Sequence, residues 1–565
     1  MSRRRAADVA AAAALVALAF ALYHRAAGFW WAHDDFFHLA YVAEHPPTAY
    51  ALDPEVWRRL PFRMLTPLLM LSLDADLTLF GPRPGVFHLR QVAALGAAAA
   101  AVYALLRAWL RPAWSAAGGA LFLAGPPVAS LAALLMARHY VDGLLLAVAS
   151  ALAWVAALRR GSRGWAAASA ALWLAAALAK EVFVPLVALL PLVPGGRPRD
   201  RWRLALPHAV ALALYAAYRL YLLDTLVGGY GSAVPPGKEA QALAGLPLSL
   251  ARTLAGGGTA GWLALVLALV AALAFLWRER RATPLLAGGA VAVLLPLLPL
   301  AGEVAPRHAT VAWTALAFAA TVAAARWARS GAGGGRPPRS TAAGRWLAPV
   351  GFAVLLVAAL AANRVAWAQT VEEQRRLAAE NRFALAMGPD DLLDHPAELP
   401  AALDAMPVFA LRVHGRRLEP VGRFADDLFL CRGGAEGKRA WRWQGEGGRM
   451  VAVGAAELAA RRRRACAALR GDAPLSVRLV PSEPVLWWRL GPYEEGDYRI
   501  LLDDGVRAIP VPAEGGYWLQ RRGPFRLRVR YGSPAGWTTY SPELVVELGS
   551  GRPVEWRRGA AEEGG

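Results

Sequence analysis

Long apolar runs constrain the fold of this chain more than any other feature, because a membrane-spanning helix needs about 20 consecutive, mostly apolar residues. The first run ends near Tyr23, and further runs centre on 86–108, 115–136, 140–158, 165–180, 183–194, 204–223, 259–277, 284–301, 308–325 and 346–362. The runs at 165–180 and 183–194 are short and could instead form one broken hairpin. We therefore predict a polytopic α-helical membrane domain over residues 1–367, with about eleven transmembrane helices.

Composition and charge also indicate a membrane protein. Only 18% of the 565 residues are charged, whereas a soluble protein carries about 25%. Lys and Arg outnumber Asp and Glu by 62 to 42, and many arginines form clusters between the apolar runs, near 107–111, 159–163, 197–203, 278–281 and 326–345. Such clusters are typical of cytoplasmic loops and differ from the basic stripe of a nucleic-acid-binding protein. We predict a cytoplasmic N-terminus, a periplasmic or extracellular C-terminal region, and no nucleic-acid partner.

The first outer loop, residues 25–85, contains the most unusual polar stretch, Trp30-Trp31-Ala32-His33-Asp34-Asp35-Phe36-Phe37-His38. Tryptophans are ordinary at a membrane interface, but two adjacent carboxylates at the edge of a low-dielectric region repel each other and are costly to desolvate. The stretch is therefore either a solvated loop or a catalytic site. Later in the loop, the half-apolar segment 68–80 contains Asp74 and Asp76, so we predict that this helix lies in the interface.

These features occur in a recognisable order along the chain. The acid pair is followed by Arg63-Met64-Leu65-Thr66-Pro67, by the interfacial segment, by Phe80-Gly81 ahead of Phe87-His88-Leu89, and by a second span. Further elements are Leu121-Phe122 with Pro126, Ala137-Arg138-His139-Tyr140, Ala179-Lys180-Glu181, Tyr218-Arg219 and Gly228-Gly229-Tyr230. Residues 8–325 thereby resemble the GT-C superfamily of multi-spanning glycosyltransferases, with protein O-mannosyltransferases the closest likeness. The chain departs from that family in having Arg63-Met64 in place of Arg-Pro, and its C-terminal region shows no 34-residue helical repeat.

The resemblance implies that a sugar is transferred from a polyprenyl-phosphate carrier to a glycan, lipid or protein acceptor on the outer face. Asp34 matches the family's first acid, which implies that it takes the proton of the acceptor hydroxyl. Asp35 would then orient the acceptor or hold a metal. Cations beside the departing phosphate would stabilise its charge, and the candidates are Arg63, Arg138, Lys180 and Arg307. Each cation alone is more typical of an interface residue whose charged end reaches water, but the recurrence of several cations on the side of the acids favours a site.

Other polar residues on the same predicted face complete the candidate cavity. They are His33, His139, Tyr140, Glu181, Glu303 and His308. Glu181 could instead neutralise Lys180, and Glu303 could instead pair with Arg307. No two histidines share a helical ligand spacing with a carboxylate, so the sequence leaves a divalent metal undecided. The glycine-rich loop 224–257 follows no strand, which argues against nucleotide binding and leaves a lid or a plain connector.

The residues after the membrane domain predict a soluble part with three regions. Residues 368–474 form a charged stalk and a mixed α/β segment, and residues 551–565 a disordered tail. Residues 475–550 alternate between apolar and polar side chains, which predicts a small antiparallel β-sandwich. Its aromatic residues, Trp487, Trp488, Tyr517, Trp518 and Trp537, either stack on sugars or form the core. Cys431 and Cys466 could pair, but their spacing does not decide it.

Two other functions stay open at this stage. A transporter or lipid flippase would line its pathway with the same acids and cations, and inverted repeats, which are not evident here, would favour it. A degenerate GT-C scaffold would bind lipid or a partner protein without catalysis. The leading hypothesis is a glycosyltransferase of the GT-C type, embedded in the lipid bilayer, that uses a polyprenyl-phosphate sugar.

Overall fold

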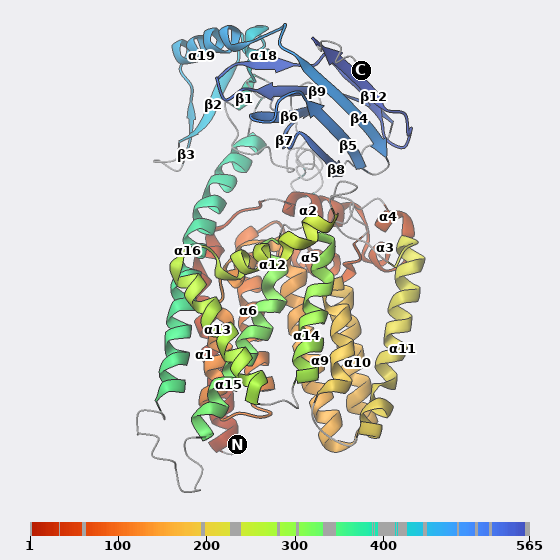
Figure 1. Cartoon of the computed structure of the whole chain (residues 1–565), viewed down its shortest axis with the longest axis vertical. Helices are drawn as coiled ribbons and strands as arrows, with labels where there is room; N and C mark the ends of the chain where they lie inside the picture. The colour runs from red at the N-terminus through yellow and green to blue at the C-terminus, as the bar shows by residue number, and fades with distance from the viewer. Residues whose placement is uncertain are drawn as a thin grey trace.

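A computed structural model shows a mostly helical chain with a β-rich C-terminal part (Figure 1). The structure describes residues 3–32, 34–58, 64–193, 198–226, 239–278, 283–300, 304–330, 346–386, 388, 390–393, 413, 415, 426–444, 449–482, 485–502, 507–518 and 523–559. The N-terminus lies at the end of the helical bundle that is farther from the β-rich part (Figure 1). The predicted combination of apolar helices with a C-terminal β-rich region is therefore confirmed.

Six helices in the described part of the chain are long and apolar enough to cross a membrane. They are α1 (Arg3–Tyr23), α6 (Pro84–Leu106), α9 (Arg138–Arg160), α11 (Pro198–Leu223), α15 (Thr310–Ser330) and α16 (Leu347–Ala386). Two bent pairs raise the number to eight if each pair forms one span. The first is α7 (Pro112–Leu123) with α8 (Pro126–Ala133), bent by 62°, and the second is α12 (Glu239–Ala255) with α13 (Gly258–Arg278), bent by 111°.

The predicted count of eleven spans is not confirmed, because three apolar runs form shorter elements. The run at 165–180 is the 17-residue helix α10 (Arg163–Ala179). The run at 183–194 is the 3₁₀ helix η4 (Glu181–Leu192), and the run at 284–301 is the 12-residue helix α14 (Thr283–Leu294) followed by the 3₁₀ turn η7 (Leu295–Leu300). Prolines at 185 and 191 lie inside η4, where each removes a backbone donor and clashes with a continuing α-helix.

Helix α12 corrects the prediction of a loop over residues 224–257, since its residues 239–255 are helical. Leu246, Leu250 and Leu254 repeat every four residues, so they lie on one face of the helix. Leu246 and Leu254 are buried in the main hydrophobic core of the bundle, with Leu250 packed against it. The glycines and prolines at 228–237 drew the prediction toward a loop, although they precede the helix.

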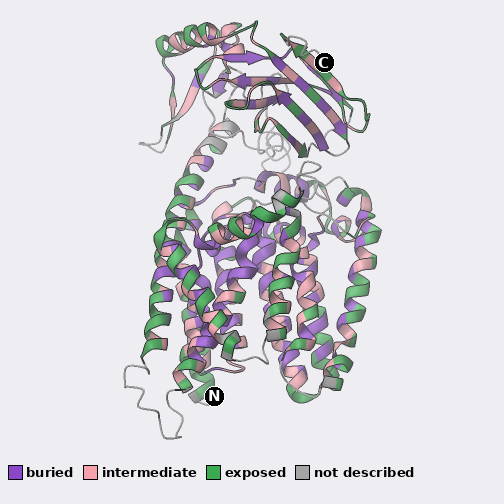
Figure 2. Ribbon diagram, in the orientation of Figure 1, coloured by how far each residue is buried: buried purple, intermediate pink, exposed green. Residues whose placement is uncertain are grey.

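The outward faces of the bundle are apolar, as expected for helices that contact lipid. Along α11 the exposed side chains include Trp202 (68%), Leu206 (65%) and Leu214 (58%). Figure 2 shows buried positions gathered in the interior of the bundle and exposed positions along its outer helices. A soluble protein rarely exposes a continuous apolar surface of this kind, so the burial pattern agrees with a membrane protein.

The first long loop forms four short helices at the end of the bundle that faces the β-rich part (Figure 1). They are α2 (Asp35–Glu44), α3 (Pro47–Leu52), α4 (Pro54–Arg58) and α5 (Pro67–Phe80). A second hydrophobic cluster holds them, including the fully buried Trp31, Trp57 and Phe87. This packing fixes the position of α2, which begins at the acid pair.

The β-rich part contains a small three-stranded sheet and a two-sheet sandwich. The small sheet has the order β1 (Asp391–Leu393), β2 (Arg439–Gln444), β3 (Arg449–Ala452). One sandwich sheet has β10 (Thr538–Tyr540), β9 (Pro524–Gly532), β6 (Asp497–Leu502) and β7 (Arg507–Val511), with β11 (Leu544–Glu547) also on β9. The other has the order β12 (Val554–Arg558), β4 (Leu475–Ser482), β5 (Val485–Gly491), β8 (Glu514–Trp518).

Two details of the sandwich settle or correct predictions from the sequence. Trp488 is buried in the sandwich core and Trp537 packs against that core, whereas Tyr517 is 37% exposed. Strand β12 corrects the prediction that residues 551–565 form a disordered tail. It is ordered because Val554 and Trp556 pack against the same core and because the strand pairs with β4.

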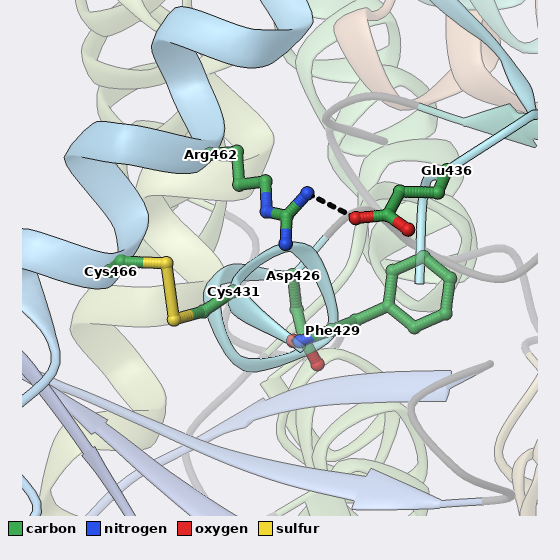
Figure 3. Close-up of a disulfide and its surroundings, with 6 residues drawn as sticks. All are labelled: Asp426, Phe429, Cys431, Glu436, Arg462 and Cys466. Atoms are coloured by element: carbon green, nitrogen blue, oxygen red, sulfur yellow. Dashed lines mark hydrogen bonds and ion pairs between the residues drawn. A yellow bond between two sulfur atoms is a disulfide. The ribbon is translucent and has the colours of Figure 1, made fainter. Parts of the chain in front are cut away.

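A disulfide joins the two helices beside the small sheet. Cys431 at the end of α18 (Asp427–Cys431) is bonded to Cys466 in α19 (Ala455–Ala468), with the Cα atoms 5.0 Å apart (Figure 3). Asp426 caps α18 by accepting the Phe429 N–H at 2.6 Å, and Arg462 of α19 pairs with Glu436 at 2.5 Å (Figure 3). The pairing that the cysteine spacing left open is therefore present.

Candidate active site

The acid pair opens helix α2, and its two members have different surroundings. Asp34 is the N-cap residue of α2 and is partly exposed, and its side chain makes no capping hydrogen bond. Asp35 is 4% exposed. Of these two neighbouring carboxylates, Asp34 is therefore accessible to a substrate, whereas Asp35 is buried.

The Asp35 carboxylate holds two backbone segments together. Its oxygens accept the N–H of Ala32 at 3.0 Å and the N–H of Met136 at 3.0 Å. Met136 belongs to the 3₁₀ turn η3 (Leu135–Ala137) that leads into α9. Burial raises the pKa of the Asp35 carboxyl to about 7, although the two N–H donors act in the opposite direction. This geometry favours a positioning role for Asp35 over the predicted contact with acceptor or metal.

Five basic side chains from four parts of the chain interact electrostatically near the acid pair. We call them the basic cluster: His38 on α2, His139 on α9, Lys180 between α10 and η4, and Arg307 and His308 on the 3₁₀ turn η8 (Pro306–Ala309). The charges of Lys180, His38, Arg307 and His308 all act on His139, and those of Asp34 and Lys180 act on His38.

Ring contacts give the basic cluster a definite geometry. Tyr140 lies at its centre, with its ring 4.6 Å from the His139 ring, 6.0 Å from the His308 ring and 5.8 Å from the Lys180 ammonium. The His308 Nδ1 accepts the Ala305 N–H at 3.2 Å, which fixes the orientation of that ring. Lys180 is buried beside these rings, so its positive charge lies where water screens it little.

Glu181 joins this cluster to the first loop. Its Oε1 accepts the Arg219 Nη1–H at 2.8 Å and the Leu65 N–H at 2.6 Å, and its Oε2 lies 3.6 Å from the Lys180 ammonium. Lys180 also donates to the Met64 sulfur at 2.7 Å. One carboxylate therefore faces two cations, which leaves a net positive charge beside the first loop.

Arg138 lies in a separate buried network. Its guanidinium pairs with Asp76 of α5, and it donates to the Phe87 carbonyl at 3.0 Å and to Gln91 Oε1 at 3.4 Å. Arg90 pairs with the same carboxylate. Arg138 is 1% exposed and Asp76 is fully buried. This geometry does not favour Arg138 as a ligand of a donor phosphate, and instead indicates that it holds α5, α6 and α9 together.

Three predicted site residues, His33, Arg63 and Glu303, lie outside the described residues, as does the glycine motif Gly228-Gly229-Tyr230. Within the ranges that the structure does describe, no three His, Cys, Asp or Glu side chains gather in a way that could hold a metal ion. The candidate divalent metal therefore has no assigned ligands.

Two members of the arrangement were not among the candidates chosen from the sequence. Arg219 enters the prediction from the sequence only as part of the Tyr218-Arg219 element, and His38 only as one of several histidines near the predicted outer face, with no role assigned to it. A signal for His38 was present, because residues four apart on a helix share a face and His38 follows Asp34 by four positions. Arg219 gave no comparable signal, since its contact with Glu181 joins positions 38 residues apart.

A comparison with models of known protein families finds no family that matches this chain, and no curated protein matches it.

Proposed function

We propose that this protein is a membrane glycosyltransferase that moves a sugar from a polyprenyl-phosphate carrier to an acceptor hydroxyl. The observation that supports it most is the position of Asp34 at the edge of the basic cluster. Buried cations are costly unless an anion compensates them. The positive charges of Lys180, Arg219 and Arg307 outnumber the described carboxylates that face them, Asp34 and Glu181, so an anionic ligand such as a phosphate would complete the arrangement.

The reaction divides naturally between the acid and the basic cluster. Asp34 would take the proton from the acceptor hydroxyl as its oxygen bonds to the anomeric carbon of the sugar. The bond between that carbon and the phosphate oxygen breaks at the same time, and its electron pair stays on the phosphate. Lys180 and Arg307 would stabilise the charge on the departing phosphate. Arg219, which pairs with Glu181, would contribute a further positive charge nearby. The apolar helices would hold the polyprenyl chain.

The proposal includes an orientation in an inner or plasma membrane. The N-terminus would be cytoplasmic, because the arginine clusters occur between the apolar runs in the positive-inside pattern. The C-terminal part would be periplasmic or extracellular, which agrees with its disulfide, since disulfides persist in oxidising compartments. The site would then face the same side as the C-terminal part.

Binding of the carrier can be measured separately from transfer. Purified protein in detergent should bind undecaprenyl phosphate, which carries the anionic group without a sugar. Lys180→Ala should weaken this binding, because it removes a buried positive charge from the cluster, whereas Asp34→Asn should leave it intact. Absence of binding by the unmodified protein would contradict the proposal and favour a transporter or scaffold with another ligand.

A further inference from the structure

His38 has a defined orientation next to Asp34. Its ring Nδ1 lies 2.8 Å from the backbone carbonyl oxygen of Asp34, four residues earlier on α2. A carbonyl oxygen can only accept, so Nδ1 carries the hydrogen and donates it. The other nitrogen, Nε2, is then unprotonated in the neutral ring and can accept a proton.

The surroundings of His38 keep the neutral ring available. Burial lowers the pKa of His38 below its ordinary value of 6.5, the Asp34 carboxylate opposes this effect, and the Lys180 ammonium adds to it. His139 also faces His38 from α9. At neutral pH the ring is therefore uncharged, although Asp34 and Lys180 both act on it electrostatically.

We propose that His38 is a second proton-transfer residue of this site, whose Nε2 receives the acceptor proton from the Asp34 carboxyl group. This inference rests on the proposed glycosyl transfer. The acceptor O–H bond breaks as the oxygen bonds to the sugar, its proton passes to Asp34, and the same proton then passes to His38. Asp34 is thereby returned to its carboxylate form before the next turnover, and His38 releases the proton to solvent.

The chemical reason for a second group is the weakness of a carboxylate as a base near neutral pH. An unperturbed aspartate has a pKa of about 3.9 and an unperturbed histidine one of about 6.5. Proton transfer is most effective when the pKa of the base lies near the working pH. Burial lowers the pKa of His38 below that ordinary value, and its imidazole would take up the proton from Asp34 without replacing the acid that contacts the acceptor.

A purely structural role for His38 has to be separated from this one. A histidine can simply satisfy a helix carbonyl with its Nδ1–H, and His45 on the same helix does so with the Tyr41 carbonyl at 2.9 Å. His45 therefore provides a matched control, because it makes the same local hydrogen bond but has no part in the basic cluster.

The test is a double-mutant cycle on the full-length protein in liposomes, with a panel of polyprenyl-phosphate sugars as donors. His38→Gln should lower kcat/KM by about 10²-fold, the lower end of the range for general acid–base catalysis, while His45→Gln should not. Residues that act in one proton path are not additive, so Asp34→Asn/His38→Gln should be no slower than Asp34→Asn alone. Melting temperature and undecaprenyl phosphate binding should be unchanged in each variant.

The pH dependence gives a second, independent readout. In the unmodified protein, kcat/KM should fall as His38 becomes protonated, at a pH below 6.5, and His38→Gln should lack this fall. Wild-type turnover by His38→Gln, an equal loss in His45→Gln, or additive losses in the double variant would overturn the role of His38 and leave glycosyl transfer intact. Failure of the unmodified protein to transfer any sugar would overturn both proposals together.

Discussion

Asp76 offers the sharpest test of how the helices are held together. Its carboxylate is completely buried and pairs with Arg138, which is 1% exposed, and with Arg90, whose side chain is 41% exposed. Asp76→Asn keeps the size of the side chain but removes the charge. Arg90 can turn to water, whereas Arg138 would stay buried, with the neutral partners Phe87, Gln91 and Ser72 and with Asp142 as the nearby carboxylate that still acts on it.

The expected cost follows from that difference in exposure. Removing one partner of a buried ion pair costs about 3–5 kcal/mol when the remaining charge is left without compensation, and the lower end of this range is expected here because Asp142 still acts on Arg138. Unfolding of the purified protein in detergent, followed by helical circular dichroism against denaturant concentration, should show this loss of stability. Replacing both partners with apolar residues, as in Asp76→Leu/Arg138→Met, should cost less than Asp76→Asn alone, since neither charge of the buried pair remains.

An exposed pair provides the control for this measurement. Arg489 and Glu514 lie 3.2 Å apart on the sandwich, with side chains 69% and 41% exposed, so Glu514→Gln should change stability by no more than about 1 kcal/mol. The reasoning would be refuted if Asp76→Asn were as mild as this control, or if the apolar double variant were the least stable of the three.

Three further predictions concern packing, the disulfide and pH. Gly125→Ala should cost about 1–3 kcal/mol of stability, because its new methyl group would lie 1.9 Å from the Trp313 ring nitrogen, whereas Gly351→Ala meets nothing within 4 Å and should be harmless in the same melt. Cys431→Ser should destabilise the C-terminal part by roughly 4 kcal/mol, since the disulfide closes a loop of 35 residues; an unchanged melt of that part would contradict this. Burial raises the pKa of Asp35 to about 7, so its protonation stabilises the folded state fully below about pH 4, and this stabilisation is lost as the pH rises through 7. Asp35→Asn should therefore flatten the dependence of the melting temperature on pH. An unchanged slope would contradict this role of Asp35.

The sequence was sufficient for those parts of the fold that depend on local pattern. Alternation of apolar and polar residues in stretches such as 525–531 predicted strands that the structure contains as β9 and its neighbours. Apolar length predicted the long helices, but it did not distinguish a spanning α-helix from a proline-containing 3₁₀ segment such as η4. Strand β12 was missed because five residues near a charged, glycine-rich end give little periodicity.

The candidate site shows a similar division between local and long-range information. The order of polar residues at the ends of apolar runs selected His139, Tyr140, Lys180 and His308, which the structure brings together around one tyrosine ring. Residue type alone did not separate Lys180, which lies in the basic cluster, from Arg138, which is bound to Asp76. That difference depends on which helix packs against which. Likewise, the two backbone N–H groups that occupy Asp35 come from segments about a hundred residues apart.

The most direct test of the proposed function is the transfer rate of Asp34→Asn in liposomes that contain polyprenyl-phosphate sugars. Asp53→Asn is the matched control, because Asp53 is an exposed acid in the same loop. We predict that Asp34→Asn loses about 10²–10⁴-fold in turnover while still binding undecaprenyl phosphate, and that Asp53→Asn keeps the wild-type rate. Wild-type turnover by Asp34→Asn would contradict the assignment of the base, and the absence of transfer by the unmodified protein with every donor would contradict the proposed function itself.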